Sequence, residues 1–488
     1  MDKLIELIDA EPFVYGINFR NRVNLTIYKG ENPTIVGANG AGKTKLAEMI
    51  AGKVIVRSGV MRLSFLPEGV HYQKGKVVKA GFESAYTMAD YANMYYQQRF
   101  SSTENEWDAI QNTRRPTVEN LIADLQGVNK DFWVEKLRLR PLFPKTLLML
   151  SSGELRRFLI ATILIKKPEI VIFDNPFIGL DTQTRADLNA LFRDIAETQQ
   201  MIFIVPDVKD IPEISKSVIP CRDLEYFPKI EKKAFLADAE FRDFIFKDNY
   251  QGTLQLPEPY VKEDRQFTNA AILSNVAIKY PTRTLFEGIN WTIRKGDKWS
   301  LSGPNGSGKS TLLSLITADN PRSYNMDITL FDRPRGTGES IWDIKKRIGY
   351  ISAEMHLYFR ENQPCKKVVA SGLFDTQGLF RQCSDAQYQK AQQIMDTFGI
   401  GHLADRPFLQ TSDGEQRLVL LARTMIKNPD LLILDEPLHG LDAVSKARAK
   451  QLINQYAAQP ERTLILVTHE PENVPECVEK HFELGLLP

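Results

Sequence analysis

Two glycine-rich segments have the residue types and spacing of a phosphate-binding loop. The first, GANGAGKT, consists of Gly37, Ala38, Asn39, Gly40, Ala41, Gly42, Lys43 and Thr44. The second, GPNGSGKS, consists of Gly303, Pro304, Asn305, Gly306, Ser307, Gly308, Lys309 and Ser310. Such loops turn successive backbone N–H groups toward phosphate oxygens at the start of a helix, where the partial charge is positive. The lysine reaches the β- and γ-phosphates and the last hydroxyl ligates Mg²⁺. The pattern therefore predicts two sites for a nucleoside triphosphate with Mg²⁺.

An aspartate at the end of an apolar run is the second expected metal ligand in each half. The runs EIVIFD and DLLILD end at Asp174 and Asp435. Continuous apolar runs are typical of buried parallel strands, whose carboxyl ends meet a ligand. We therefore expect the hydroxyls of Thr44 and Ser310 to ligate Mg²⁺. Asp174 and Asp435 would hold the same ion through its water shell.

The same motifs recur in the same order, so the chain is an internal duplication. The offset between copies is 303 − 37 = 266 at the loops and 435 − 174 = 261 at the aspartates. Each loop follows a short apolar run and precedes a helical pattern, as an α/β unit requires. We predict a first domain over 1–225, a connector over 226–266 and a second domain over 267–488.

The composition excludes several classes of protein. Lysine plus arginine number 62 against 61 aspartates plus glutamates, which gives no basic field for nucleic acid. The four cysteines are scattered and form no zinc or disulfide pattern. The sequence shows neither a secretory leader nor a long apolar span, so we expect a cytoplasmic protein that meets a membrane only through a partner.

Further motifs resemble those of ATP-binding-cassette (ABC) ATPases. LSSGE at 150–154 and TSDGE at 411–415 resemble the signature loop of that family, and IFDNP and ILDEP resemble its second nucleotide motif. The short loops at 179–181 and 440–442, and the histidine of VTH at 467–469, match too. The resemblance implies two tandem P-loop nucleotide-binding domains, each with a RecA-like α/β core, an antiparallel β subdomain and a helical subdomain. The compact layout is similar to tandem cassettes associated with molybdenum transport.

The family resemblance also implies composite sites, in which ATP lies between the phosphate loop of one cassette and the signature loop of the other. One such site would combine the second loop and Asp435 with the other cassette's signature residues, namely Ser151, Ser152 and Gly153. There Glu436 would activate the attacking water, while Lys309 and His469 would contact the transferred phosphate. Asp181 would approach from across the interface.

The other composite site departs from the family pattern at the two positions that support ATP hydrolysis, those of the catalytic glutamate and the histidine. It would combine the first loop and Asp174 with signature residues Ser412, Asp413 and Gly414. Asn175 stands at the position of the catalytic glutamate, and an amide does not accept a proton from water at neutral pH. Aligning IFIVPDVKDIP with ILVTHEPENVP places Pro206 opposite His469. We expect this site to hold ATP with slow or no hydrolysis; the alternative is a site that binds nothing.

The family's coupling glutamine is missing from both halves. Aligning LSFLPE with GYISAE places Pro67 and Ala353 at its positions. Glu68 or Glu354 would substitute after a local shift. This departure weakens the expectation of ordinary coupling to a transporter.

Aromatic residues provide further candidates. Tyr280 occupies the position where the family stacks a ring on adenine, and Phe13 or Tyr15 is its counterpart; plain packing is an equal alternative for each. One more aromatic stripe is interpreted as core in preference to a partner groove: Tyr91, Tyr95, Tyr96 and Phe100.

The leading functional hypothesis is an ATPase with ATP and Mg²⁺ as cofactors, serving a transport system with separate membrane-spanning permease subunits and molybdate as candidate substrate. The first rival is a soluble regulatory ABC ATPase acting on the ribosome or another assembly. That branch of the family has a long charged linker and both glutamates intact, and neither is found here. An ATP-gated clamp is the third possibility. The sequence names neither the substrate nor the partner.

Overall fold

The structure is a computed structural model, and it describes most of the chain. The described residues are 2–15, 17–81, 116–147, 150, 152–178, 180, 182–246, 255–257, 266–280, 283–304, 306–352, 355, 359, 362–376, 379, 381–468 and 473–485. Contacts divide the chain into two compact units, the first mainly from residues up to 248 and the second mainly from the remainder. Each unit is described by itself.

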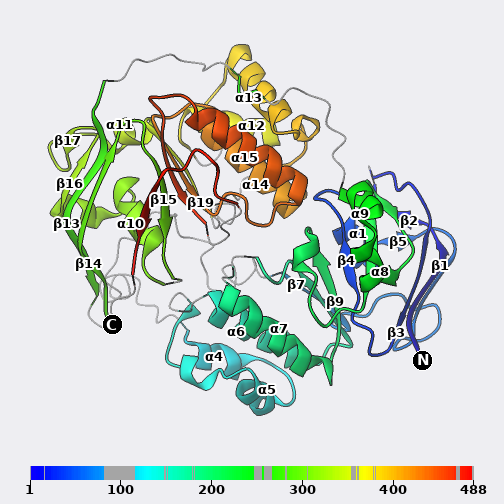
Figure 1. The fold of residues 1–488 in the computed structure, drawn as a ribbon. Helices are drawn as coiled ribbons and strands as arrows, with labels where there is room; N and C mark the ends of the chain where they lie inside the picture. The colour runs from blue at the N-terminus through cyan, green and yellow to red at the C-terminus, as the bar shows by residue number, and fades with distance from the viewer. Residues whose placement is uncertain are drawn as a thin grey trace. The chain divides into compact units, whose positions relative to one another are not determined.

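The first unit contains strands and helices in mixed order (Figure 1). Its strands are β1 (Lys3–Ala10), β2 (Pro12–Phe13), β3 (Val23–Tyr28), β4 (Thr34–Val36), β5 (Ile55–Val56), β6 (Val60–Leu63), β7 (Val77–Gly81), β8 (Ile170–Asp174), β9 (Gln200–Val205), β10 (Ser217–Arg222), β11 (Glu225–Tyr226) and β12 (Ile230–Glu231). Its helices are α1 (Lys43–Ile50), α4 (Val118–Asp124), α5 (Lys130–Lys136), α6 (Ser152–Leu164), α7 (Thr182–Ala196), α8 (Lys232–Ala237) and α9 (Ala239–Phe246).

The main sheet of the first unit has the order β11-β10-β4-β9-β8-β7, and the strands from β10 to β7 run parallel. Every residue of β4 and β8 is buried, as expected of strands covered on both faces. Because the strands are parallel, the carboxyl ends of β4, β8 and β9 meet at one edge. A separate antiparallel sheet has the order β3-β1-β6.

Helices α4, α5 and α6 gather on one side of the first unit, with α7 beside α6 (Figure 1). Their apolar faces form one buried cluster with β8 and β9, centred on Phe158, Phe173 and Phe203. The rings of Phe173 and Phe203 stack with centroids 5.7 Å apart. This packing fixes the helix that starts at Ser152 relative to the strand that ends at Asp174.

The second unit repeats this plan. Its strands are β13 (Asn269–Tyr280), β14 (Arg283–Arg294), β15 (Lys298–Ser302), β16 (Asp327–Leu330), β17 (Arg333–Pro334), β18 (Ile348–Ile351), β19 (Leu431–Asp435), β20 (Thr463–Val467) and β21 (Lys480–Glu483). Its helices are α10 (Lys309–Ile316), α11 (Ile341–Lys345), α12 (Cys365–Ala370), α13 (Asp385–Thr397), α14 (Asp413–Met425) and α15 (Ala443–Ala457). The parallel sheet has the order β18-β19-β20-β15-β21 and the antiparallel sheet β14-β13-β16-β17.

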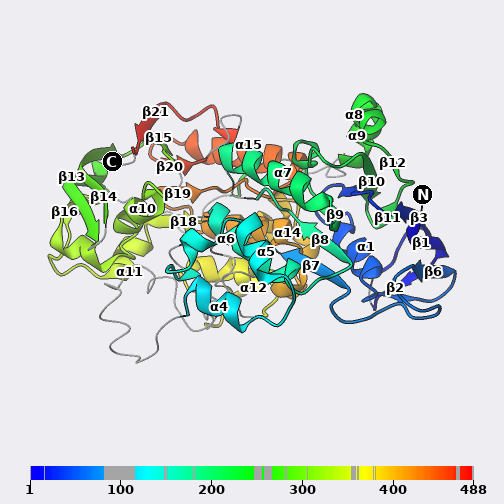
Figure 2. The ribbon, with the colours of Figure 1, turned by 90° about the horizontal axis from the view of Figure 1, so that it is seen from below.

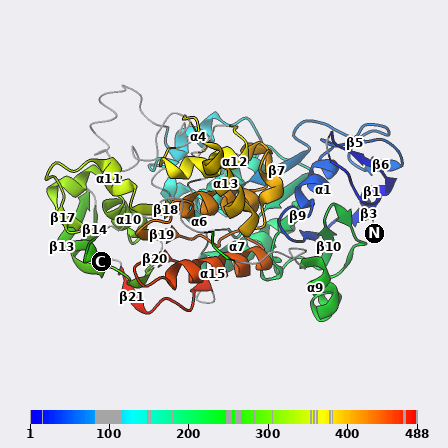
Figure 3. The same ribbon diagram turned by 90° about the horizontal axis from the view of Figure 1, so that it is seen from above.

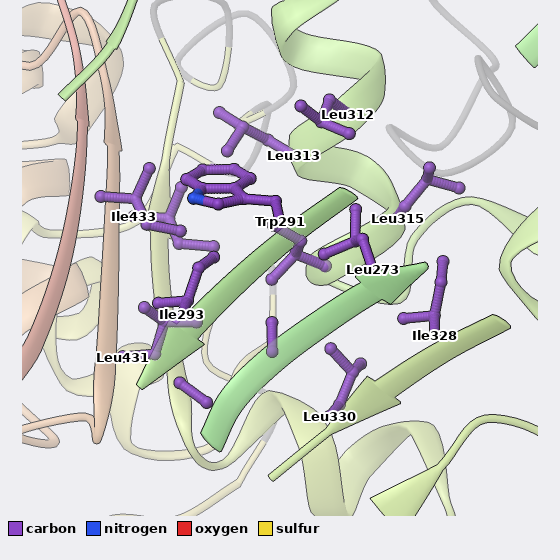
Figure 4. Packing of buried hydrophobic residues seen from close by; sticks show 14 of the residues in the cluster. Leu273, Trp291, Ile293, Leu312, Leu313, Leu315, Ile328, Leu330, Leu431 and Ile433 are labelled. Carbon is purple, nitrogen blue, oxygen red and sulfur yellow. The ribbon is translucent and has the colours of Figure 1, made fainter. Parts of the chain in front are cut away.

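The antiparallel strands β13, β14, β16 and β17 lie together at one side of the second unit, with α10 next to them (Figures 2 and 3). Figure 4 shows the core between these layers, where Trp291 of β14 packs near Leu313 of α10 and Ile433 of β19. Trp291 is 3% exposed, and its ring stacks on Phe482 with centroids 4.6 Å apart. The core therefore fixes the phosphate-loop helix between the two sheets, and the predicted α/β class with an antiparallel subdomain is confirmed.

The segment predicted as the start of the connector folds with the first unit. Strand β12 pairs with β10, and α8 and α9 lie beside β10 (Figures 2 and 3). Phe235 and Ile245 are buried in one cluster with Val36 and Val205. We therefore place the end of the first folded unit near Phe246 and not at residue 225.

Within the described part of the chain, a membrane-spanning helix of sufficient length and apolarity is not found.

Candidate nucleotide-binding sites

The second glycine-rich loop joins β15 to α10 and holds its lysine inside the turn. Lys309 is 8% exposed, and its Nζ donates to the carbonyl oxygens of Gly303 at 2.7 Å and Pro304 at 3.0 Å. The ammonium is thus positioned at the mouth of the helix, where backbone N–H groups point outward. This arrangement suits a phosphate group.

The first loop, between β4 and α1, has the same geometry. Lys43 is 7% exposed, and its Nζ donates to the carbonyl oxygens of Gly37 at 2.8 Å and Ala38 at 2.7 Å. The residue before each helix is a glycine with left-handed backbone, φ +99° at Gly42 and +97° at Gly308. A Cβ there would lie within 3 Å of a leucine side chain, so only glycine suits both turns. Both predicted cradles are therefore built.

Two buried side chains beside the first cradle, the Tyr226 phenol and the Cys221 thiol, are uncharged. Tyr226 donates its hydroxyl to the Gly42 carbonyl at 3.2 Å, and burial raises the pKa of this phenol. Burial also raises the pKa of the Cys221 thiol to about 12, although the charge of Lys43 lowers it. Neither group supplies an anion at neutral pH, so Lys43 keeps its charge available for phosphate.

The predicted metal ligands of the second cassette lie together. The Ser310 hydroxyl donates to Oδ2 of Asp435 at 3.0 Å, and Asp435 is 8% exposed. Hard oxygen donors of this kind are the ligands that Mg²⁺ prefers, and Mg²⁺ is usually held by one or two carboxylates plus substrate phosphates. These residues fit a magnesium ion with a bound triphosphate.

The first cassette differs at the equivalent position. The partner of Asp174 is Lys79 of β7, whose Nζ lies 2.6 Å from Oδ2 of the carboxylate. The Lys79 side chain is 31% exposed and that of Asp174 8%. An ammonium thus occupies one side of the carboxylate that was predicted to hold Mg²⁺ with Thr44. Sequence reasoning missed Lys79; the available signal was a lysine inside the short apolar run VVKAG.

Strand register identifies the counterpart of Lys79 in the second cassette. Lys79 pairs with Ile172 across β7 and β8, and Tyr350 pairs with Ile433 across β18 and β19. Since 433 − 172 = 261, the offset of the strand-end aspartates, Tyr350 is the equivalent residue.

The same register corrects the alignment of LSFLPE with GYISAE. Leu63, the first residue of LSFLPE, belongs to β6 in the antiparallel sheet, so Pro67 is not at the coupling position. Strand β7 is the true counterpart of β18, which places the coupling position of the first cassette at Phe82. Both Phe82 and its counterpart Ala353 lie outside the described residues, as does Glu354.

Asn175 and Glu436 occupy equivalent positions, as predicted. Each directly follows a strand-end aspartate, with φ +48° at Asn175 and +53° at Glu436. Each backbone N–H donates to the neighbouring strand, Asn175 to the Ile204 carbonyl at 2.9 Å and Glu436 to the Val467 carbonyl at 3.0 Å. Left-handed backbone at a non-glycine residue is uncommon and gathers at functional sites. Among the described residues, the buried Oδ1 of Asn175 has no hydrogen-bond partner.

Strand register also shows that Pro206 of the first cassette occupies the position equivalent to His469 of the second. Ile204 and Val467 pair with equivalent aspartates, Asp174 and Asp435. Pro206 and His469 each follow two residues later. Pro206 is buried and has neither a titratable group nor a side-chain donor, whereas His469 lies outside the described residues.

The signature loops stand at helix starts. Ser412 caps α14, and Glu415 accepts hydrogen bonds from the Ser412 backbone N–H at 2.7 Å and hydroxyl at 2.8 Å. Asp413 and Gly414 form the first turn of α14, where the partial charge of the helix is positive. Gly153 lies in the equivalent turn of α6, which begins at Ser152. Both loops have the helix start that anion binding requires.

The structure separates the two aromatic candidates of the first cassette. The ring of Phe13 is covered by the Arg57 guanidinium, 3.5 Å from its centroid. Tyr15 is 94% exposed, so the packing interpretation is wrong for this residue.

Several other predicted positions lie outside the described residues: Ser151, Gly179, Asp181, Asn305, His469 and the aromatic stripe at 91–100. The side chains of Ser152 and Tyr280 are outside the described set as well.

Comparison with known proteins agrees with this architecture. A family model described as ABC transporter matches residues 20–178 and 286–439, one region in each unit. The ABC transporter ATP-binding protein ModF of Escherichia coli (strain K12) is 31% identical over 466 residues, which are 94% of this chain and 92% of that protein. An uncharacterized ABC transporter ATP-binding protein of Schizosaccharomyces pombe is 26% identical over 96% of this chain and 95% of that protein.

A solved structure shares the tandem fold. One chain of ribosome-bound archaeal Pelota and ABCE1 aligns over 96% of this chain and 74% of its own length, with a TM-score of 0.56 and 21% identity. At this identity the likeness concerns the fold alone.

Proposed function

The chain belongs to the ABC transporter family, and we propose that it is a tandem-cassette ATPase in which the second cassette hydrolyses ATP while the first holds it. The observation that carries this proposal is the structural equivalence of Glu436 and Asn175. Their backbone conformation and hydrogen bonding match, so the two sites differ in side-chain chemistry and not in architecture.

In the second cassette the Glu436 carboxylate is the candidate group to orient and deprotonate the attacking water. General-base residues typically contribute about 10²- to 10⁴-fold in rate. Lys309 stabilises charge on the transferred phosphoryl group, and His469 is proposed to assist it. Ser310 and Asp435 would hold Mg²⁺, which would supply positive charge to the phosphate oxygens.

In the first cassette the phosphate-binding residues are retained, but the residues expected to support hydrolysis are replaced. Lys43 sits in its cradle as Lys309 does in the second. Asn175 replaces the base and Pro206 replaces the histidine. Retention of ATP without turnover is the outcome that this combination supports.

We also propose that each site is completed by the signature loop of the other cassette, as the family resemblance implies. Ser151, Ser152 and Gly153 would then serve the active site, and Ser412, Asp413 and Gly414 the inactive one. The helix-start geometry of α14 supports a role in phosphate binding.

The proposed setting is a transport system. Its support is the ModF match over almost the full length of both chains. Separate permease subunits are the proposed partners and molybdate the proposed substrate. A ribosome-directed role receives no support beyond the fold, because the match to the ribosome-bound chain is only 21% identical.

Steady-state ATP hydrolysis by two matched variants tests the asymmetry. Glu436→Gln should lower turnover by about 10²-fold or more, the range of a lost general base. Asn175→Glu should raise turnover less than about twofold, because Pro206 and Lys79 remain in the first site. ATP turnover in Glu436→Gln protein comparable to that of the wild type would refute the assignment of Glu436 as the general base.

A further inference from the structure

The contact between Lys79 and Asp174 changes what the first cradle can bind. In the second cassette the equivalent carboxylate, Asp435, accepts a hydrogen bond from the hydroxyl of Ser310. This hydroxyl carries no charge, so it does not repel a Mg²⁺ ion that binds between the two side chains. In the first, Asp174 faces the ammonium of Lys79 at 2.6 Å. Tyr350, at the position of Lys79 in the second strand, carries no positive charge.

A divalent ion and the ammonium would compete for the same carboxylate. Two positive charges a few ångströms apart repel strongly where water is largely excluded, and Asp174 is 8% exposed. The carboxylate already has its charge balanced by a covalently attached cation, which is always present at high effective concentration. Mg²⁺ would therefore have to displace Lys79 before it could bind.

The ammonium can also perform part of the work of the metal. It has three N–H donors, so it can remain on Asp174 while it donates to an oxygen of a bound phosphate. The Lys79 side chain is 31% exposed, so part of it is open to solvent. It supplies one positive charge, whereas Mg²⁺ supplies two.

We propose that Lys79 takes the place of Mg²⁺ in the first cassette, so that this site binds a nucleoside triphosphate without a divalent metal. This inference rests on the proposed function, because it assumes that the first cradle binds nucleotide. It also gives the loss of hydrolysis a third cause besides Asn175 and Pro206, since phosphoryl transfer depends on metal ions that bridge the β- and γ-phosphate oxygens.

The test measures ATP binding by full-length protein in which one cradle is disabled. Lys309→Ala protein reports the first site and Lys43→Ala protein the second, by calorimetry with ATP in excess Mg²⁺ or in EDTA. We expect the dissociation constant of the first site to differ less than about threefold between the two conditions, whereas that of the second should rise roughly tenfold or more in EDTA.

Two lysine variants, made in the Lys309→Ala protein, identify the responsible group. Lys79→Met should weaken binding in EDTA roughly tenfold, the loss of one hydrogen bond to a charged group, while Mg²⁺ restores most of the affinity. Lys76→Met is the matched control, because Lys76 is three residues earlier and pairs with exposed Glu169 at 3.0 Å. It should leave both affinities unchanged.

A count of bound metal provides a second readout. With excess ATP and Mn²⁺ as the paramagnetic probe, wild-type protein should bind one Mn²⁺ per chain and Lys79→Met protein two. Strict dependence of the first site on Mg²⁺, an unchanged affinity in Lys79→Met protein, or two Mn²⁺ in the wild type would each overturn the inference and leave the proposed function standing. Absence of binding to Lys309→Ala protein in both conditions would overturn this inference together with the first-site part of the proposed function.

Discussion

Replacement of Glu31 by Gln should destabilise the first unit, because this carboxylate ties residues 226–231 to the turn before the first cradle. Oε2 of Glu31 accepts from Lys229 Nζ at 2.6 Å and from the Tyr28 backbone N–H at 3.1 Å. Oε1 accepts from the Ser217 hydroxyl at 2.6 Å. The Lys229 ammonium also donates to the Thr26 carbonyl at 2.7 Å, so the pair joins β3, β10 and the segment after β11.

The magnitude follows from the burial of the pair. The Glu31 and Lys229 side chains are each 19% exposed, so solvent screens their attraction only in part. Hydrogen bonds to charged groups contribute about 1.5–3 kcal/mol, and the amide retains some of them. We therefore expect Glu31→Gln to cost about 1–2 kcal/mol, which lowers Tm of a unit this size by about 2–8 °C.

The cost of Glu31→Gln should depend on pH in a defined direction. Burial alone would raise the pKa of Glu31, but the hydrogen bonds from Lys229, Ser217 and Tyr28 together with the Lys229 charge hold it below its ordinary value. A carboxyl whose folded-state pKa is lowered stabilises the protein above its unfolded pKa and loses that contribution as pH falls through the folded pKa. The difference between wild type and variant should be constant from pH 6 to 8 and vanish in acid.

Thermal unfolding followed by calorimetry at several pH values measures this effect. Glu169→Gln is the control, because its partner Lys76 is one-third exposed and surface pairs contribute less than about 1 kcal/mol. An equal Tm for Glu31→Gln and wild type at pH 7, or a difference that grows as pH falls, would refute the assignment of residues 226–231 to the first unit's fold.

Three further predictions concern the nucleotide sites. Ser310→Ala should raise the Mg²⁺ concentration for half-maximal ATPase activity about tenfold, because Asp435 loses its companion ligand, and a Mg²⁺ titration of activity measures this. If the ring of Tyr15 stacks on adenine, Tyr15→Ala should weaken ATP binding to Lys309→Ala protein by about fivefold or more. Phe13→Ala removes the ring that the Arg57 guanidinium covers and should lower Tm instead. Equal ATP affinities with and without the Tyr15 ring would show that it has no ligand role. Ser151→Arg should abolish steady-state hydrolysis while Ser412→Arg mainly weakens binding at the first site, and unchanged turnover in Ser151→Arg protein would refute the paired arrangement.

Those features that depend on local sequence could be predicted. The loops at Lys43 and Lys309 have their lysines inside the turns because glycine spacing alone determines that geometry. Asp174 and Asp435 end buried strands because each run has the length and composition of a central parallel strand. The equivalence of Pro206 and His469 followed from one unbroken strand motif on each side.

Features that depend on pairing between distant segments could not be predicted. LSFLPE resembles a strand entering the coupling position, but only its first residue, Leu63, lies in a strand. That strand, β6, pairs with β1 in the antiparallel sheet, and residues 64–68 are outside it. Strands β11 and β12 are two residues long, too short for a periodic pattern, and are fixed by β10. The contact of Lys79 with Asp174 joins residues 174 − 79 = 95 positions apart, so no local rule indicates it.

The changes in the first cassette are confined to one edge of one sheet. Asn175 and Pro206 follow the ends of β8 and β9, and Lys79 reaches the same edge from neighbouring β7. The cradle itself is built from β4 and α1, and the buried cluster that holds Ile35 of β4 and Leu46 of α1 includes none of these three side chains. Phosphate binding draws on loop N–H groups and Lys43, whereas hydrolysis draws on the strand ends. Because different elements carry the two tasks, we propose that the three strand-edge residues of the first cassette remove hydrolysis while the cradle keeps its binding geometry.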